Sequence, residues 1–240
     1  MLSSTDCAGP PPAIPAAVIL GGDLQRLASA VMPHAARDAA DPVLCAVQWE
    51  ISGGALWLAA ADGHTGAAAR WPLPGRPPGT AGPALVSANQ AADLAGFAAA
   101  GPGPVAVKVR SGSVTVTRAD GTARRALWPL PLPAPGRIPD WREVVTGLLS
   151  AAPGPAPGGI SVRSADLCRF RVQSSLDATV AGGMPASLRL ELRPHPRSGS
   201  PLVLVTCEDW LIGYIRLAPG GGTRGDEGAG SWLPRLAVQR

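Results

Sequence analysis

Residues 43–72, VLCAVQWEISGGALWLAAADGHTGAAARWP, carry the pattern that decides the fold. Two runs with alternating apolar residues lie on either side of Gly53-Gly54. Period-two alternation predicts strands, and glycines supply the positive φ that a tight hairpin turn needs. The second run ends in Asp62-Gly63-His64, a polar sequence typical of a bend. The stretch therefore predicts an antiparallel hairpin with a bend after its second strand.

Glycine and proline indicate where the chain leaves its regular elements. The 240 residues include 30 Gly and 27 Pro, which cluster near residues 74–83, 101–104, 129–136 and 151–159 and after residue 217. Clustered breakers mark loops, whereas dispersed ones would indicate disorder throughout. A chain of this length is predicted to form one large or two small domains with a substantial core.

Composition limits the partners and the compartment. The formal net charge of +4 permits an acidic partner such as nucleic acid but does not require one. Cys45, Cys168 and Cys207 lie among apolar residues and are interpreted as small core residues in a reduced compartment, in preference to zinc or disulfide roles. No signal peptide is recognisable, and no apolar run approaches the ~20 residues that span a bilayer. We therefore expect a cytoplasmic protein without membrane contact.

Helices and strands are predicted in a repeated order. Apolar residues at helical spacing predict helices at residues 24–36 and 85–100, with Asp23 and Ser87 as N-caps, and a third helix from Ser164 to about residue 176. Beyond the hairpin, strands are predicted at residues 67–73, 105–110, 113–118, 122–130, 186–193, 201–207 and 210–217. A helix followed by three or four strands thus occurs three times. Such units bury their sheet faces by packing together, which indicates an α+β class.

This order resembles that of the bacterial DNA polymerase III beta subunit, the sliding clamp. In that family one strand ends in T-D-G-H-R-L-A and a later segment reads F-P-D-Y-R-R-V; this chain has ADGHTGA at 61–67 and IPDWREV at 138–144. The family's last strand contains M-P-x-R-L, and YIRL at 214–217 takes its place without the Met-Pro. The resemblance covers about residues 16–145 and 158–218. It implies a DNA-clamp-like fold of repeated helix and antiparallel β-meander units.

The resemblance implies about one and a half clamp domains. The expected parts are a disordered leader at 1–15, a unit similar to the clamp's middle domain at 16–150, a Pro/Gly linker at 151–159, a half-domain similar to the C-terminal half of the last domain at 160–218, and a flexible tail at 219–240. A beta subunit has three domains, and two copies close a ring around the duplex. Two copies of this chain would not close one, so a ring requires more copies or partner subunits, or no ring forms.

The resemblance also implies a pocket between the two units that accepts short peptides from DNA polymerases and other clamp-binding proteins. Its wall would consist of Asp62, Gly63, His64, Thr65, Gly66, Ile215, Arg216 and Leu217. The family's Arg-Leu after the histidine is Thr65-Gly66 here, which removes a charged stem and an apolar group. Clamp helices face double-stranded DNA, and the implied DNA-facing residues are Arg26, Arg37, Arg163, Arg169 and Arg171.

These residues also have structural interpretations. Asp62 is predicted to cap the bend by accepting hydrogen bonds from backbone amides. His64 is interpreted as a buried or bend-stabilising imidazole, in preference to a ligand contact. Trp141 is interpreted as an inter-domain anchor. The strand tryptophans are interpreted as packing residues rather than a base-stacking platform: Trp49, Trp57 and Trp71.

No pattern supports catalysis. The chain has no Gly-x-Ser-x-Gly elbow and no phosphate-binding glycine loop, and its three histidines have no metal-ligand spacing. We therefore predict a protein that is not an enzyme, with no catalytic residue, no metal and no cofactor.

The C-terminal tail ends in SWLPRLAVQR at 231–240. A tethered Trp-Leu-x-x-Leu cluster is either a peptide that docks in the clamp pocket of the same molecule or of a neighbouring molecule, or an incidental end. Unchanged oligomer size and peptide affinity after deletion of 231–240 would exclude docking.

The predicted function is that of a clamp-like replication or repair accessory, a homo-oligomer that binds partner proteins, with double-stranded DNA as a candidate second partner. The alternative is a regulatory or protein-interaction module that keeps the clamp fold and no longer encircles DNA. The mass of the protein in solution distinguishes the two.

Overall fold

The computed structural model describes residues 16–37, 41–73, 81–128, 141–152, 162–170, 188–194 and 200–217. The predicted leader, most of the predicted linker and the tail lie outside these ranges. The described elements are β1 (Ala16–Leu20), α1 (Gly21–Val31), η1 (Met32–His34), η2 (Pro42–Cys45), β2 (Ala46–Ser52), β3 (Ala55–Ala61), β4 (Thr65–Pro72), β5 (Ala81–Ser87), α2 (Ala88–Ala99), β6 (Pro104–Arg110), β7 (Ser113–Arg118), β8 (Ala123–Leu127), α3 (Trp141–Ser150), α4 (Ser164–Cys168), β9 (Arg189–Pro194), β10 (Pro201–Cys207) and β11 (Leu211–Arg216).

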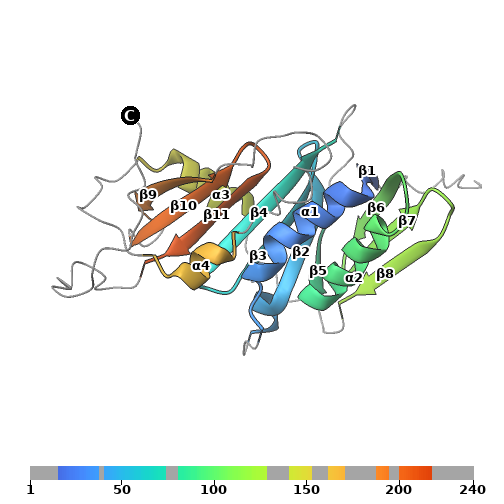
Figure 1. Cartoon of the computed structure of the whole chain (residues 1–240), viewed down its shortest axis with the longest axis horizontal. Helices are drawn as coiled ribbons and strands as arrows, with labels where there is room; N and C mark the ends of the chain where they lie inside the picture. Colours follow the sequence, from blue (N-terminus) through green and yellow to red (C-terminus); the bar gives the residue numbers. More distant parts are fainter. Residues whose placement is uncertain are drawn as a thin grey trace, which may run out of the picture.

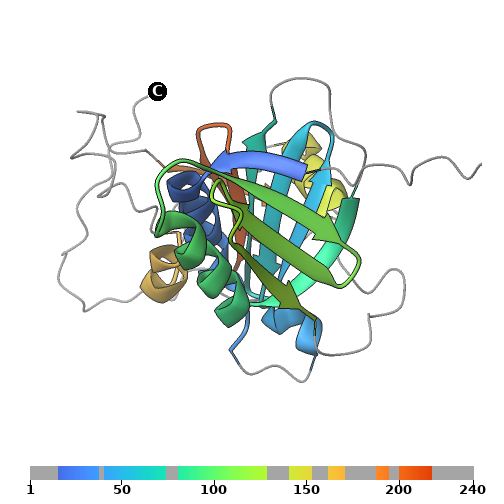
Figure 2. The same cartoon turned by 90° about the vertical axis from the view of Figure 1, so that its right-hand side faces the viewer.

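The strands form two antiparallel sheets. One has the order β1-β6-β7-β8, and the other has the order β5-β2-β3-β4-β11-β10-β9. Because β4 pairs with β11, strands from both sides of the predicted linker lie in one continuous sheet. Helices α1 and α2 lie side by side against the inner faces of the sheets, while α3 lies on the opposite face of the larger sheet (Figures 1 and 2). The predicted α+β class with antiparallel strands is confirmed.

The predicted hairpin forms, although residues 43–45, predicted as the start of its first strand, belong to η2. Strands β2 and β3 pair from Gln48 with Ala59 to Ser52 with Ala55. Gly53 and Gly54 in the turn have φ angles of 56° and 72°, which residues with side chains rarely adopt. Strand β4 then returns along β3, so the hairpin becomes the centre of the larger sheet.

The helices differ from prediction at their ends. Helix α1 starts at Gly21, and Asp23 lies in its first turn instead of capping it. The predicted cap of α2 is confirmed, because the Ser87 hydroxyl accepts from the Gln90 amide and the Gln90 side chain accepts in return. However, α2 begins at Ala88, so Leu85 belongs to β5. Ser164 is the first residue of α4 and not its cap, and the rest of that predicted helix beyond residue 170 lies outside the described ranges.

Two strands, one α-helix and the short 3-10 helices η1 and η2 were not predicted. Strands β1 and β5 are short apolar segments next to glycine or proline, which masks their alternation. Helix α3 covers part of the segment that was interpreted only as a family motif. Strand β1 pairs with β6, strand β5 pairs with β2, and α3 forms one wall of the candidate site.

Small residues allow α1 and α2 to approach each other closely. A Cβ atom added at Gly21 would lie 2.8 Å from the carbonyl carbon of Ala98 in α2. Leu24 and Leu27 of α1 and Leu94 of α2 are almost fully buried in the main core. Such burial contributes roughly 1.5–3 kcal/mol for each leucine, so packing rather than helix propensity holds this pair.

Candidate partner-binding site

Strands β4 and β11 meet where the two predicted halves of the pocket were expected. Thr65 lies opposite Ile215 and Gly66 lies opposite Tyr214. The amide of Arg216 also donates a hydrogen bond to the carbonyl of His64, at 2.8 Å. The chain therefore brings residues 62–66 beside residues 215–217.

Asp62 caps the bend, as predicted. Its Oδ1 atom accepts from the amides of His64 at 2.9 Å and Thr65 at 2.8 Å. Its Oδ2 atom forms an ion pair with Arg169, which follows α4. Burial alone would raise the pKa of Asp62, but the hydrogen bonds from Thr65, Arg169 and His64 hold it below its usual value. Asp62 thus has a structural role, and it joins the bend to the segment after α4.

A buried histidine lies beneath this bend. His34 is fully buried, its Nδ1 atom lies 3.0 Å from the Thr65 hydroxyl, and its ring centroid lies 4.4 Å from that of Phe170. Burial, with a contribution from the positive charge of Arg169, lowers the pKa of His34 from 6.5 to about 4, although Asp62 acts in the opposite direction. The imidazole is therefore neutral at pH 7.

The histidine that the sequence singled out is the exposed one. His64 contributes its backbone to the bend while its side chain lies in solvent, so the predicted burial of its imidazole is wrong. The signal for His34 was present, because it lies three residues after Val31 and continues the apolar stripe of α1.

The outer face of the β4–β11 pair is filled by two aromatic rings. A Cβ atom added at Gly66 would lie 2.7 Å from the Tyr214 ring and 2.9 Å from the Trp141 ring. The two rings are stacked with centroids 6.4 Å apart. Burial raises the pKa of Tyr214. Glycine at position 66, where the resembling family has leucine, therefore makes room for the chain's own aromatic side chains.

The predicted wall residues differ in accessibility. Gly63, His64 and Arg216 are exposed, whereas Thr65, Gly66 and Ile215 are buried. Asp62 and Leu217 are partly buried. Only one part of the predicted wall is therefore open to a partner.

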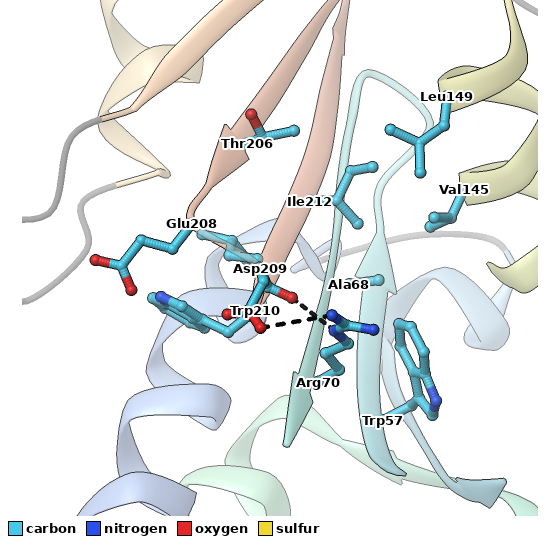
Figure 3. A pocket seen from close by; sticks show the side chains of 11 residues that line it. Trp57, Ala68, Arg70, Val145, Leu149, Thr206, Glu208, Asp209, Trp210 and Ile212 are labelled. Atoms are coloured by element: carbon cyan, nitrogen blue, oxygen red, sulfur yellow. Dashed lines mark hydrogen bonds and ion pairs between the residues drawn. The ribbon is translucent and has the colours of Figure 1, made fainter. Parts of the chain in front are cut away.

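A groove lies beside α3, next to this junction. It has a volume of about 230 Å³ and lies between α3 and the outer face of strands β3, β4, β10 and β11 (Figure 3). Trp57, Val145 and Leu149 supply apolar walls, and Leu149 is 56% exposed. At one end, Arg70 donates from Nε to the Asp209 carbonyl at 2.6 Å. An apolar floor with a few polar groups at its rim suits a short peptide.

Sequence reasoning missed the groove because it depends on α3. The spacing of Trp141, Val144, Val145 and Leu148 is i, i+3, i+4 and i+7, which would have predicted an amphipathic helix. Val144 and Leu148 pack against β10 and β11. The groove is open on the side of the helix that carries Val145 and Leu149.

The predicted DNA-facing arginines are scattered. Arg26 stacks over the Trp210 ring at 4.5 Å, and Arg169 is paired with Asp62. Arg37 and Arg163 are exposed, and Arg171 lies outside the described residues. Helices α1 and α2 together contain one arginine and two aspartates. Within these two helices there is no excess of positive charge.

The cysteines and acidic groups do not form a metal site in the described ranges. There, no three His, Cys, Asp or Glu side chains lie close enough to hold an ion. Cys207 is buried, as predicted, whereas Cys168 is exposed on α4, so its assignment to the core is wrong. None of the described helices has the length and apolar character to cross a membrane.

Known structures similar to this one include bacterial DNA sliding clamps. The Pseudomonas aeruginosa clamp (DNA polymerase III subunit beta) bound to griselimycin superimposes with a TM-score of 0.54 and 15% identity, covering 88% of this chain and 66% of that chain. The Bacillus subtilis clamp gives 0.54 and 13%, covering 89% and 67%. The beta subunit from Borrelia burgdorferi in complex with a natural product gives 0.53 and 11%, covering 85% and 64%.

These comparisons establish the fold. No family described by a sequence profile matches the chain, and no curated protein sequence matches it. The chain spans about two thirds of the length of the clamp chains. It therefore has the fold of the bacterial sliding clamp, as the resemblance of its motifs predicted.

Proposed function

We propose that this chain is a non-enzymatic clamp-fold module that binds a short apolar peptide segment of a partner protein in the groove beside α3. The groove carries the proposal, because it exposes Leu149 and part of Trp57 next to polar groups that can fix the register of a peptide. Its clamp-like fold favours a replication or repair context. Partners would then be a DNA polymerase or another clamp-binding protein.

The open part of the predicted pocket lies apart from the groove. Arg70, at the groove, and Thr65, at the bend, are five residues apart along β4, which is roughly 17 Å at 3.4 Å per residue. The rings of Trp141 and Tyr214 fill the outer face above Gly66 between them, so Gly63, His64 and Arg216 would contact a different part of the partner.

Replacing Leu149 with glutamate is expected to weaken peptide binding at least about tenfold, because it places a charge against the apolar wall. Suitable probes are fluorescein-labelled decapeptides in which Leu or Phe alternates with Gln and Ser, measured by anisotropy. Folding should be unaffected, since Leu149 is 56% exposed. Leu190→Glu is the matched control: Leu190 is 43% exposed on β9 and lies opposite the core residue Val205, so its side chain points to the face of the sheet away from the groove. Equal affinities for the wild-type protein and Leu149→Glu would contradict the proposal.

The protein is also expected not to be retained on circular DNA. Helices α1 and α2, which would face the duplex in a clamp, contain one arginine against two aspartates. Each neutralised phosphate contributes a slope of roughly −0.9 to the salt dependence of binding, so we expect a slope close to zero. Gel filtration with light scattering, followed by retention on nicked circular DNA, measures both mass and encirclement. A closed oligomer with salt-dependent retention would favour a DNA-encircling clamp instead.

A further inference from the structure

The outer face of the β1-β6-β7-β8 sheet is basic, and its four strands contain no Asp or Glu. Alternation places Lys108, Arg110 and Arg125 on the side opposite the buried Val107 and Val109. All three cationic residues are exposed. No described helix or strand lies over this face, which is toward the viewer in Figure 2.

The strand register gathers the three cations. Lys108 lies opposite Thr115, and Thr115 lies opposite Arg125, so Lys108 and Arg125 are about 10 Å apart, two strand spacings. Arg110 is two residues from Lys108 along β6, which is roughly 7 Å. The remaining cations of this sheet lie elsewhere: Arg118 stacks on the Phe97 ring at 4.0 Å, and Arg124 pairs with Asp93 of α2.

Aliphatic side chains share the face with these cations. Val18 is 59% exposed, Leu20 is 54% exposed and Leu127 is 51% exposed. Leu127 and Arg110 both pair with Ser113, so they flank it in one row across the sheet. A surface of this composition matches carboxylates and apolar side chains presented together.

We propose that this face, called the basic sheet face, binds an acidic segment of a partner protein that carries aliphatic residues between its carboxylates. A peptide fits better than nucleic acid for two reasons. The four strands contain no Phe, Tyr or Trp, so the face lacks the rings on which single-stranded bases stack. A phosphate backbone would also leave the exposed aliphatic side chains uncovered. This surface is separate from the groove and does not depend on it.

The test compares two charge reversals of equal size. The double variant Lys108→Glu and Arg110→Glu removes cations from the basic sheet face, and Arg37→Glu with Arg163→Glu removes two exposed cations elsewhere. The probes are a fluorescein-labelled 16-residue peptide of Glu and Leu and fluorescein-labelled 20-nucleotide single-stranded and duplex DNA. We expect the peptide to bind the wild-type protein, and the first variant to lose at least about tenfold in affinity. The second variant should bind like the wild type.

A second pair of substitutions separates charge from apolar contact. Val18→Ser with Leu20→Ser is expected to weaken binding of the Glu-Leu peptide about threefold to tenfold without a change in net charge. Urea midpoints equal to the wild type's would show that the variants are folded. If the variant with Lys108→Glu and Arg110→Glu is not folded, Lys108→Gln with Arg110→Gln takes its place. Equal losses in both charge-reversal variants would overturn the proposal. Tighter binding of either DNA, lost with Lys108→Glu and Arg110→Glu, would assign the face to nucleic acid and also overturn it.

Discussion

Replacing Gly213 with alanine is expected to destabilise the protein by about 3 kcal/mol, the upper range for overpacking a tight site. A Cβ atom at this position would lie 2.5 Å from the carbonyl oxygen of Gly66 and 2.9 Å from Cζ of Phe170. The carbonyl belongs to the neighbouring strand, so β4 and β11 would have to separate. Urea unfolding followed by tryptophan fluorescence measures the loss. A midpoint equal to the wild type's would show that the junction tolerates a side chain.

Gly96→Ala is the matched control for this substitution. Gly96 lies within α2, and nothing lies within 4 Å of a Cβ atom built on it. Alanine is favoured over glycine by roughly 0.8–1.0 kcal/mol in a helix interior, so this variant should be slightly more stable. In the background of Phe170→Ala, Gly213→Ala should cost less than in the wild-type background but still destabilise, because the clash with the Gly66 carbonyl remains.

Local patterns predicted the parts of this fold that depend on neighbouring residues. The alternation around Gly53-Gly54 predicted the β2–β3 hairpin, and the Ser87-Gln90 pair is a capping box whose serine was predicted as the cap. Asp62 was predicted to cap the bend, and it does so through two backbone amides. In each case the partner lies within a few residues, so sequence spacing nearly specifies the contact.

The groove depends on contacts that no local pattern specifies. Its walls come from residues 57–70, 145–149 and 206–212, which are far apart along the chain. Strands β4 and β11 are neighbours in the larger sheet although they lie far apart in the sequence. The resemblance to the clamp family predicted this junction. It did not predict that Trp141 and Tyr214 would fill the space above Gly66.

The sequence also did not predict which basic residues are available to a partner. The arginines of the predicted helices suggested a DNA-facing surface, but Arg26 is used against Trp210 and Arg169 against Asp62. The basic sheet face instead draws on strands β6 and β8, whose cations were read only as members of alternating strands. The side to which a charged residue points depends on register, and one residue of slip would reverse it.

The stability of the protein is expected to fall by about 3 kcal/mol between pH 6.5 and pH 4, because His34 is buried in its neutral form. Its pKa is 6.5 without the fold and about 4 within it. Well above pH 6.5 His34 carries no proton in either state, so it does not make the free energy of unfolding depend on pH. Below that pH the unfolded chain binds a proton that the folded chain excludes, and the free energy of unfolding decreases. The loss levels off only below pH 4, where the full difference of 2.5 pKa units corresponds to about 3 kcal/mol.

His34→Gln should remove this pH dependence while keeping a polar partner for the Thr65 hydroxyl. Urea unfolding at intervals from pH 7.0 to 4.5 gives the free energy for the wild-type protein and the variant, and only the wild type should lose stability as the pH falls. His64→Gln is the control, because the exposed His64 side chain should leave the wild-type slope intact. The lowered pKa of Asp62 acts in a lower window, since its contribution is lost as the pH falls below the ordinary aspartate value of 3.8. If His34→Gln retained the wild-type slope, another group would carry it, and the buried contacts of His34 with Thr65 and Phe170 would not determine how acid destabilises the fold.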